Sequence, residues 1–188
     1  MKTISWTLIA VLAFACWLAL PIECRAQARC PWLNAATAAG VLGGEAQVAV
    51  TAPANPGNGK GVGATSYPDQ VRMDRFDVSC DFSRKESTAE YTLSIVVKTM
   101  SDPAKDFGSF LALCTGPTMA LRGIGNEAVQ CMMKDSRQTG YEQVIGRVRD
   151  RAFVLTVHRG SASHAATDGD ELSNEARNVA EQVAGSLF

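Results

Sequence analysis

The stretch Gly57–Ala64, "GNGKGVGA", contains residues that could cradle a phosphate group. Its small residues fit the dinucleotide-binding pattern G-x-G-x-x-A, and Lys60 lies among them. In a dinucleotide site a helix follows the glycines directly, because its N-terminus binds the pyrophosphate. Here the chain continues as "SYPDQV", and Pro68 and the strand expected after it leave no room for such a helix. We therefore predict an exposed Gly/Pro-rich loop without a nucleotide cofactor, and we keep Lys60 as a candidate binding residue.

A serine–histidine–aspartate set can be imagined in the segment "RGSASHAATDGD". His164 follows Ser161 and Ser163 and precedes Asp168. No Gly-x-Ser-x-Gly elbow precedes this segment, and nothing in it indicates an oxyanion hole. The simpler interpretation is an exposed histidine in a helix-capping loop, so a hydrolase that uses His164 with Ser161 or Ser163 is the alternative hypothesis and not the leading one.

The second histidine, His158, ends the run "AFVLTVH", whose alternation turns Phe153, Leu155 and Val157 inward. We therefore expect His158 to face outward into solvent. A metal site made of His158, His164 and Asp168 would match no standard ligand spacing. We expect no metal site and no catalytic residues.

Two sulfur-bearing side chains, Met132 and Met133, lie beside Cys131 and are of the soft type that copper prefers. We expect Met133 to pack in the core and Cys131 to form a disulfide, so this segment predicts no copper site.

Arg147 and Arg149 are expected on one face of a strand, opposite Val148. With Arg72 or Arg75 they could form an anion or partner site. An alternating charged face is more often the solvated side of a sheet, and nearby aspartates would neutralise the patch. Arg147 and Arg149 are nevertheless kept, with Lys60, as candidate binding residues.

The N-terminus has the form of a secretory signal peptide. Lys2 precedes the apolar run Ile4–Ile22, and the small residues of "AQA" end at Ala28. An uncleaved membrane anchor is the rival interpretation, because the run has about the minimum length for a span. We predict a signal peptide over residues 1–28 and a single exported domain over residues 29–188, in the periplasm or secreted.

The charge and cysteine content fit such a domain. The net charge of −1 argues against nucleic acid, which needs a concentrated basic face. Beyond the signal, the even number of cysteines implies two disulfides, although the three possible pairings stay open at this point. The four are Cys30, Cys80, Cys114 and Cys131.

The elements that would position these residues are helices and antiparallel strands in one α+β domain. Hairpin-connected strands give a single antiparallel sheet, and helices with one apolar stripe must cover one of its faces. Expected helices lie within 31–44, 101–114 and 168–188, and their candidate N-caps are Asn34, Ser101 or Asp102, and Asp168 or Asp170. Expected strands lie at 46–50, 75–82, 91–99, 127–133, 141–148 and 152–158, and the alternation in 91–99 turns Tyr91, Leu93, Ile95 and Val97 inward.

Three short motifs carry a resemblance that covers most of residues 30–187. They are "CPWLNAATAAGVLGG", "CDF" at Cys80, and "GIGNEAVQC" followed by "VIGRVRDRAFVLTV". They resemble the extracytoplasmic sensor-like domains of bacteria, which include the DUF3558-type lipoproteins and the outer domain of a mycobacterial membrane kinase.

The resemblance implies two disulfides, Cys30–Cys80 and Cys114–Cys131. The chain departs from the lipoproteins in lacking a lipidated cysteine, and from the kinase in lacking a cytoplasmic domain.

Together these features predict an exported, non-catalytic sensor-like domain that binds a small ligand or an envelope protein. We expect no cofactor, no nucleic-acid partner and no membrane attachment after signal cleavage. A periplasmic hydrolase is the alternative, and an envelope structural protein without a small ligand is a third hypothesis.

Overall fold

A computed structural model describes residues 29–51, 77–87, 89–114, 116–131, 141–160 and 169–188. Its elements in chain order are α2 (Ala35–Val41), β1 (Gln47–Thr51), β2 (Val78–Lys85), β3 (Glu90–Thr99), α3 (Pro103–Leu111), β4 (Thr118–Leu121), β5 (Glu127–Cys131), β6 (Tyr141–Val148), β7 (Arg151–Arg159) and α4 (Gly169–Ser186). The predicted signal peptide lies outside these residues, so the division into residues 1–28 and 29–188 stays a prediction.

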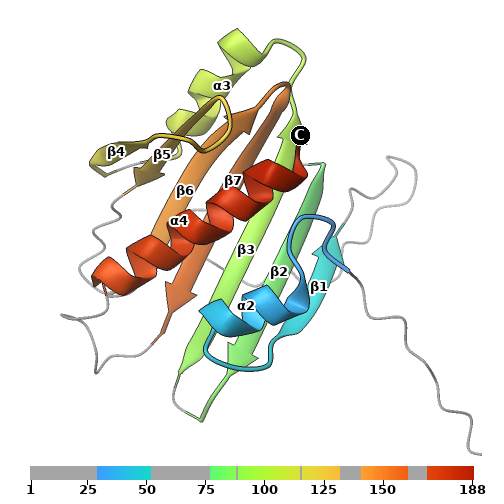
Figure 1. Cartoon of the computed structure of the whole chain (residues 1–188), viewed down its shortest axis with the longest axis vertical. Coiled ribbons are helices and arrows are strands. Elements are labelled where there is room, and N and C mark those ends of the chain that lie inside the picture. The colour runs from blue at the N-terminus through green and yellow to red at the C-terminus, as the bar shows by residue number, and fades with distance from the viewer. Residues whose placement is uncertain (1–28, 52–76, 88, 115, 132–140, 161–168) are drawn as a thin grey trace, which may run out of the picture.

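All strands of the described residues belong to one seven-stranded antiparallel sheet in the order β1-β2-β3-β7-β6-β5-β4 (Figure 1). The strands before α3 and those after it form two meanders, which join where β3 pairs with β7. This confirms the predicted α+β class with a single antiparallel sheet.

Helices α2 and α4 cover one face of the sheet (Figure 1). The strand residues predicted to point inward do so, because Leu93, Ile95, Phe153, Leu155 and Val157 are all fully buried in the core beneath these helices. The apolar stripe of α4 completes this core with Leu172, Ala176, Val179, Ala180, Val183 and Leu187.

Helix α3 differs from the expectation that the helices would share one face. Phe107 and Phe110 of α3 pack in a second buried cluster with Ile145 and Val154, which point away from α2 and α4. The physical reason is that these strands also carry apolar side chains at the outward positions near one end. Exposing those apolar side chains to water would be unfavourable, and the apolar stripe of α3 packs on them and buries them.

Strand β4 was not predicted from the sequence. It pairs only with β5 and forms one edge of the sheet, and its first three residues are exposed. A four-residue strand with so little burial leaves no alternating pattern for sequence analysis to detect.

Two of the predicted helix starts are confirmed. Asn34 caps α2, and its Oδ1 accepts a hydrogen bond from the Thr37 N–H at 2.8 Å. Asp102, one of two candidates, caps α3 and precedes Pro103 in the first turn.

Both implied disulfides are confirmed. Cys30 bonds to Cys80 with a Cα–Cα distance of 5.6 Å, and Cys114 bonds to Cys131 with a Cα–Cα distance of 5.5 Å. The first ties the segment before α2 to β2, and the second ties the end of α3 to β5.

Candidate functional site

The face of the sheet opposite α2 and α4 carries a contiguous group of polar side chains beside the cluster covered by α3. Strand register places Ser94 between Asp81 and Thr156, and Thr156 next to Gln143. In the adjacent row His158 lies between Thr92 on β3 and Tyr141 on β6. Cross-strand neighbours have Cβ atoms about 4.5–5.5 Å apart, so the group is continuous. We call it the polar face: Ser79, Asp81, Thr92, Ser94, Tyr141, Gln143, Thr156 and His158, all buried or half-buried.

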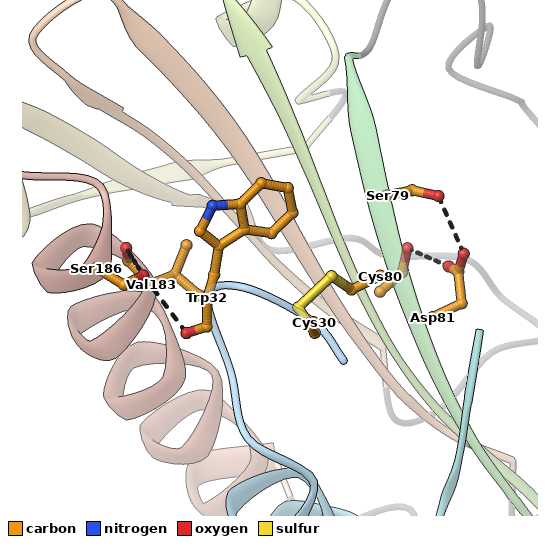
Figure 2. The surroundings of a disulfide bond; sticks show 8 residues. Cys30, Trp32, Ser79, Cys80, Asp81, Val183 and Ser186 are labelled. Atoms are coloured by element: carbon orange, nitrogen blue, oxygen red, sulfur yellow. Dashed lines mark hydrogen bonds between the residues drawn. A yellow bond between two sulfur atoms is a disulfide. The ribbon is translucent and has the colours of Figure 1, made fainter. Parts of the chain in front are cut away.

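The carboxylate of Asp81 gathers the hydroxyl groups at the β2–β3 side of the polar face. Ser94 Oγ donates to Asp81 Oδ1 at 2.7 Å, and Ser79 Oγ donates to Asp81 Oδ2 at 3.3 Å. Figure 2 shows Ser79 and Asp81 on the side of β2 away from the Cys30–Cys80 disulfide. Each carboxylate oxygen therefore already has a donor from the protein.

A second carboxylate, Asp77, lies just before β2, near the end of β3. Lys98 Nζ donates to Asp77 Oδ1 at 2.7 Å, and the Thr99 N–H donates to Oδ2 at 2.7 Å. Burial alone would raise the pKa of Asp77, but these hydrogen bonds outweigh it and hold the pKa below its ordinary value. The pair places no unbalanced charge beside the polar face.

His158 belongs to the polar face. It points away from α2 and α4, but it is half-buried, whereas the sequence predicted that it would face outward into solvent. Its ring centre lies 6.4 Å from that of Tyr141. Burial lowers the pKa of His158, and the Glu90 carboxylate opposes this only in part. Its Nδ1 atom is buried and has no hydrogen-bond partner among the described residues.

Gln143, like His158, has a buried polar atom without a hydrogen-bond partner among the described residues, and Gln143 is buried more deeply. Only 4% of its surface is exposed, and its Oε1 atom has no hydrogen-bond partner in the described part of the chain. Leaving a buried polar atom without a partner costs about 1–3 kcal/mol. Such atoms are rare in folded proteins and call for an explanation.

A buried glutamine on the opposite face shows the usual solution. Gln130 is 2% exposed, and its Nε2 atom donates to Ser173 Oγ at 2.7 Å and to Glu142 Oε2 at 3.0 Å. Burial raises the pKa of Glu142, and the bond from Gln130 counteracts this in part. This cluster ties α4 to the sheet and needs no outside partner.

The polar face holds a serine, a histidine and an aspartate, but in an arrangement unsuited to nucleophilic catalysis. Ser94 donates directly to Asp81, whereas a catalytic serine donates to its histidine and the histidine donates to the aspartate. The imidazole of His158 lacks the orienting bond at Nδ1 among the described groups. The arrangement can offer hydrogen bonds to a bound molecule, and it gives no activated nucleophile.

Arg147 lies on the same side of the sheet as α3. Its Nε donates to Glu127 Oε1 at 2.7 Å, and its guanidinium carbon lies 5.8 Å from the centre of the Phe107 ring. Both contacts hold it against the protein. Binding of an anion by Arg147 stays a prediction, and it would require Arg147 to exchange Glu127 for that anion.

The expected position of Arg149 on the same strand face as Arg147 needs correction. Arg149 lies in the turn after β6 with a φ of 55°, a left-handed conformation that non-glycine residues seldom adopt. Its N–H donates to Asn126 Oδ1 at 2.6 Å, and its Nη1 donates to the Phe188 carbonyl at 2.9 Å. The two guanidinium groups therefore have separate partners, and a joint site stays a prediction.

The remaining candidates from the sequence lie outside the described residues. They are Lys60 with its loop, Arg72, Arg75, Ser161, Ser163, His164, Asp168, Met132 and Met133. Among the residues that are described, no three His, Cys, Asp or Glu side chains gather to hold a metal ion.

A surface depression of about 480 Å³ lies at one end of β1 and β2. Arg84, one of the two cationic side chains that line it, donates to the Leu42 carbonyl at 2.7 Å. Arg84 also forms an ion pair with Glu86 and lies over the ring of Tyr91. These contacts fix the end of α2 on the sheet, so the depression is a structural junction. Its lining residues are Gly44, Glu45, Gln47, Ser83, Arg84 and Lys85.

The disulfide shown in Figure 2 is also structural. Figure 2 shows Trp32 between Cys30 and the end of α4, and Ser186 Oγ donates to the Trp32 carbonyl at 3.4 Å. Cys80 is fully buried. These contacts hold the segment before α2 against the core.

The polar face was not predicted from the sequence, although the sequence contains a signal for it. The outward positions Thr92, Ser94, Gln143 and Thr156 are polar but uncharged. A solvated sheet face usually carries Lys, Glu, Asp or Arg. The lack of charge in the centre of this face could have indicated that its side chains are half-buried.

Comparison of the chain with family models, with curated proteins and with solved structures finds no significant match. The resemblance to the sensor-like domains therefore stays a proposal. No helix in the described part of the chain combines the length and apolar character needed to cross a membrane.

Proposed function

We propose that this protein is an exported, non-catalytic binding domain of the bacterial cell envelope, of the sensor-like type. The observation that carries the proposal is the polar face, where Gln143 Oε1 and His158 Nδ1 are buried without partners among the described residues. Unsatisfied polar atoms cost stability, and departures of this kind are expected at functional sites. A bound molecule would supply the missing partners.

The two disulfides support the exported part of the proposal. Disulfides form and persist in oxidising compartments such as the periplasm and the extracellular space. The apolar N-terminal run and the small-x-small site at Ala28 give this proposal a specific cleavage point.

Native mass spectrometry of protein exported into an oxidising compartment tests the proposal. We expect a mature chain that starts at Arg29, with a mass about 4 Da below that of the reduced chain, since each disulfide removes two hydrogens. We also expect additional mass that is lost on denaturation, from a bound ligand or a partner protein. A bare mass at every protein concentration, together with no partner after cross-linking in the envelope, would argue against a binding role.

A further inference from the structure

The two unpartnered atoms of the polar face lie close enough to serve one ligand. Gln143 on β6 pairs with Thr156 on β7, and His158 follows Thr156 by two residues on the same face. Diagonal neighbours of this kind are about 7–8 Å apart at the backbone, within reach of long side chains. Gln143 and His158 are therefore near enough to each other on the sheet to belong to one site.

The chemistry of the two atoms selects the kind of group that can bind them. Gln143 Oε1 accepts hydrogen bonds only, so its partner must be a donor. His158 Nδ1 is an acceptor in one neutral tautomer and a donor in the other. A hydroxyl group both donates and accepts, so one hydroxyl satisfies Gln143 and the donor tautomer of His158, and two neighbouring hydroxyls satisfy Gln143 and the acceptor tautomer. An ammonium group fits only the tautomer in which Nδ1 accepts, and an ionised carboxylate oxygen cannot donate to Gln143.

The charges around these atoms indicate a neutral ligand. Asp81 already accepts hydrogen bonds from Ser79 and Ser94. Near the end of the same face Lys98 is paired with Asp77 at 2.7 Å. In the described structure no unpaired cation therefore faces Gln143 to balance an anionic ligand. The ring of Tyr141 beside His158 adds an apolar surface next to the two polar atoms.

We propose that the polar face binds a small uncharged ligand with several hydroxyl groups, of the sugar or polyol class, through Gln143 and His158. This rests on the proposed binding function and deepens it by naming the class of ligand. The hydroxyl groups of Thr92, Ser94 and Thr156 border the same position and give further hydrogen-bonding capacity. Small-molecule sites in proteins combine a few placed polar groups with aromatic side chains.

Nuclear magnetic resonance of the oxidised full chain tests this proposal. Glucose, sucrose and myo-inositol are the probes, and acetate and methylammonium at equal ionic strength are the charged comparisons. We expect at least one neutral probe to shift the Gln143 side-chain amide and the His158 ring resonances in a saturable manner. The charged probes should leave both sets of resonances in place.

Three variants locate the site. Gln143→Leu removes one acceptor, and we expect it to weaken binding of the neutral probe roughly tenfold, the loss of one good hydrogen bond. Gln130→Leu makes the same change on the opposite face and should leave the affinity of the folded protein unchanged. His158→Phe should weaken binding in the same way as Gln143→Leu and serves if Gln143→Leu fails to fold.

Saturable shifts caused by methylammonium or acetate alone would overturn the neutral class. Shifts that survive both Gln143→Leu and His158→Phe would overturn the location. If no probe binds but native mass spectrometry finds a bound partner of other chemistry, the sugar or polyol proposal fails while the binding function stands. If neither experiment finds a bound molecule, both proposals fail.

Discussion

Two buried glutamine side chains of the sheet differ in their hydrogen bonding, and this difference is testable at the scale of single residues. Gln130 donates to Glu142 and Ser173, whereas Gln143 Oε1 has no partner in the described structure. Gln130→Leu should lower the free energy of unfolding by about 1–3 kcal/mol, because it leaves the half-buried Glu142 without its donor. Gln143→Leu should leave it unchanged or raise it by up to about 1 kcal/mol.

Urea denaturation of the two variants and the wild type measures this contrast, with equal m-values as the check that the unfolding transition is comparable. A Gln143→Leu variant that is as unstable as Gln130→Leu would mean that Gln143 contributes to the fold as a paired group. A stable Gln143→Leu variant would fit a residue retained for binding at a cost in stability.

The half-buried imidazole of His158 predicts a pH dependence of a definite sign. Burial lowers its folded-state pKa below the ordinary value of 6.5, while Glu90 on β3 and the ring of Tyr141 on β6 are its charged and titratable neighbours. The unfolded chain then binds a proton more readily than the folded one. The contribution of His158 to stability is therefore fully present above pH 6.5 and decreases as the pH falls from 6.5 toward the folded-state pKa.

A titration of the imidazole C–H resonances, assigned with His158→Phe, measures the pKa directly. The same variant should remove the decrease in stability below pH 6.5. Burial raises the pKa of Glu142 and Glu175 above 4.5. Their contribution to stability is therefore present at low pH and is lost as they ionise on raising the pH, which is the opposite direction to that of His158. The difference between wild type and variant isolates His158, and a pKa of 6.5 or higher for this residue would contradict the prediction.

At the scale of elements, the sequence predicted what depends on local pattern. The alternation in β3 and β7 correctly predicts which side chains point into the core, and the caps Asn34 and Asp102 correctly predict where two helices begin. These features depend on residues a few positions apart. Periodicity and capping chemistry are therefore enough to find them.

The features missed at this scale depend on contacts between distant elements. Helix α3 has one apolar stripe, and nothing within it says which face of the sheet that stripe will cover. The deciding residues are Val96, Ile145 and Val154, at outward positions of three other strands. The same limitation applies to His158, since the pattern correctly turns it away from α2 and α4 but does not show how far that side is buried.

At the scale of the whole molecule, the described residues form two hydrophobic cores, one on each face of a single sheet, and each contains one disulfide. Cys80 lies in the core under α2 and α4, with Cys30 packed against it. Cys131 lies in the smaller core under α3, with Cys114 packed against that one. The resemblance to the sensor-like domains implied this pairing, whereas spacing alone left three pairings open. Each cross-link therefore fixes a different layer of the protein.

This arrangement predicts that the two disulfides contribute similar amounts of stability but protect different regions. They close loops with sequence separations of 50 and 17 residues. Loop-closure entropy gives about 4 kcal/mol for the longer loop and about 3 kcal/mol for the shorter. Replacing Cys30 and Cys80 by alanine should therefore lower the free energy of unfolding slightly more than replacing Cys114 and Cys131.

Urea denaturation of the two double variants measures how much free energy of unfolding each one loses. Amide hydrogen exchange shows which region of the protein is destabilised. Loss of Cys114–Cys131 should speed exchange in α3 first, because α3 is joined to the sheet by that bond and by one small cluster. Loss of Cys30–Cys80 should speed exchange first in α2 and β1. In each double variant, adding a reductant should not change amide exchange in the core that holds the remaining disulfide until that disulfide is reduced. Exchange that rises equally everywhere in both variants would show that the two layers unfold as one unit.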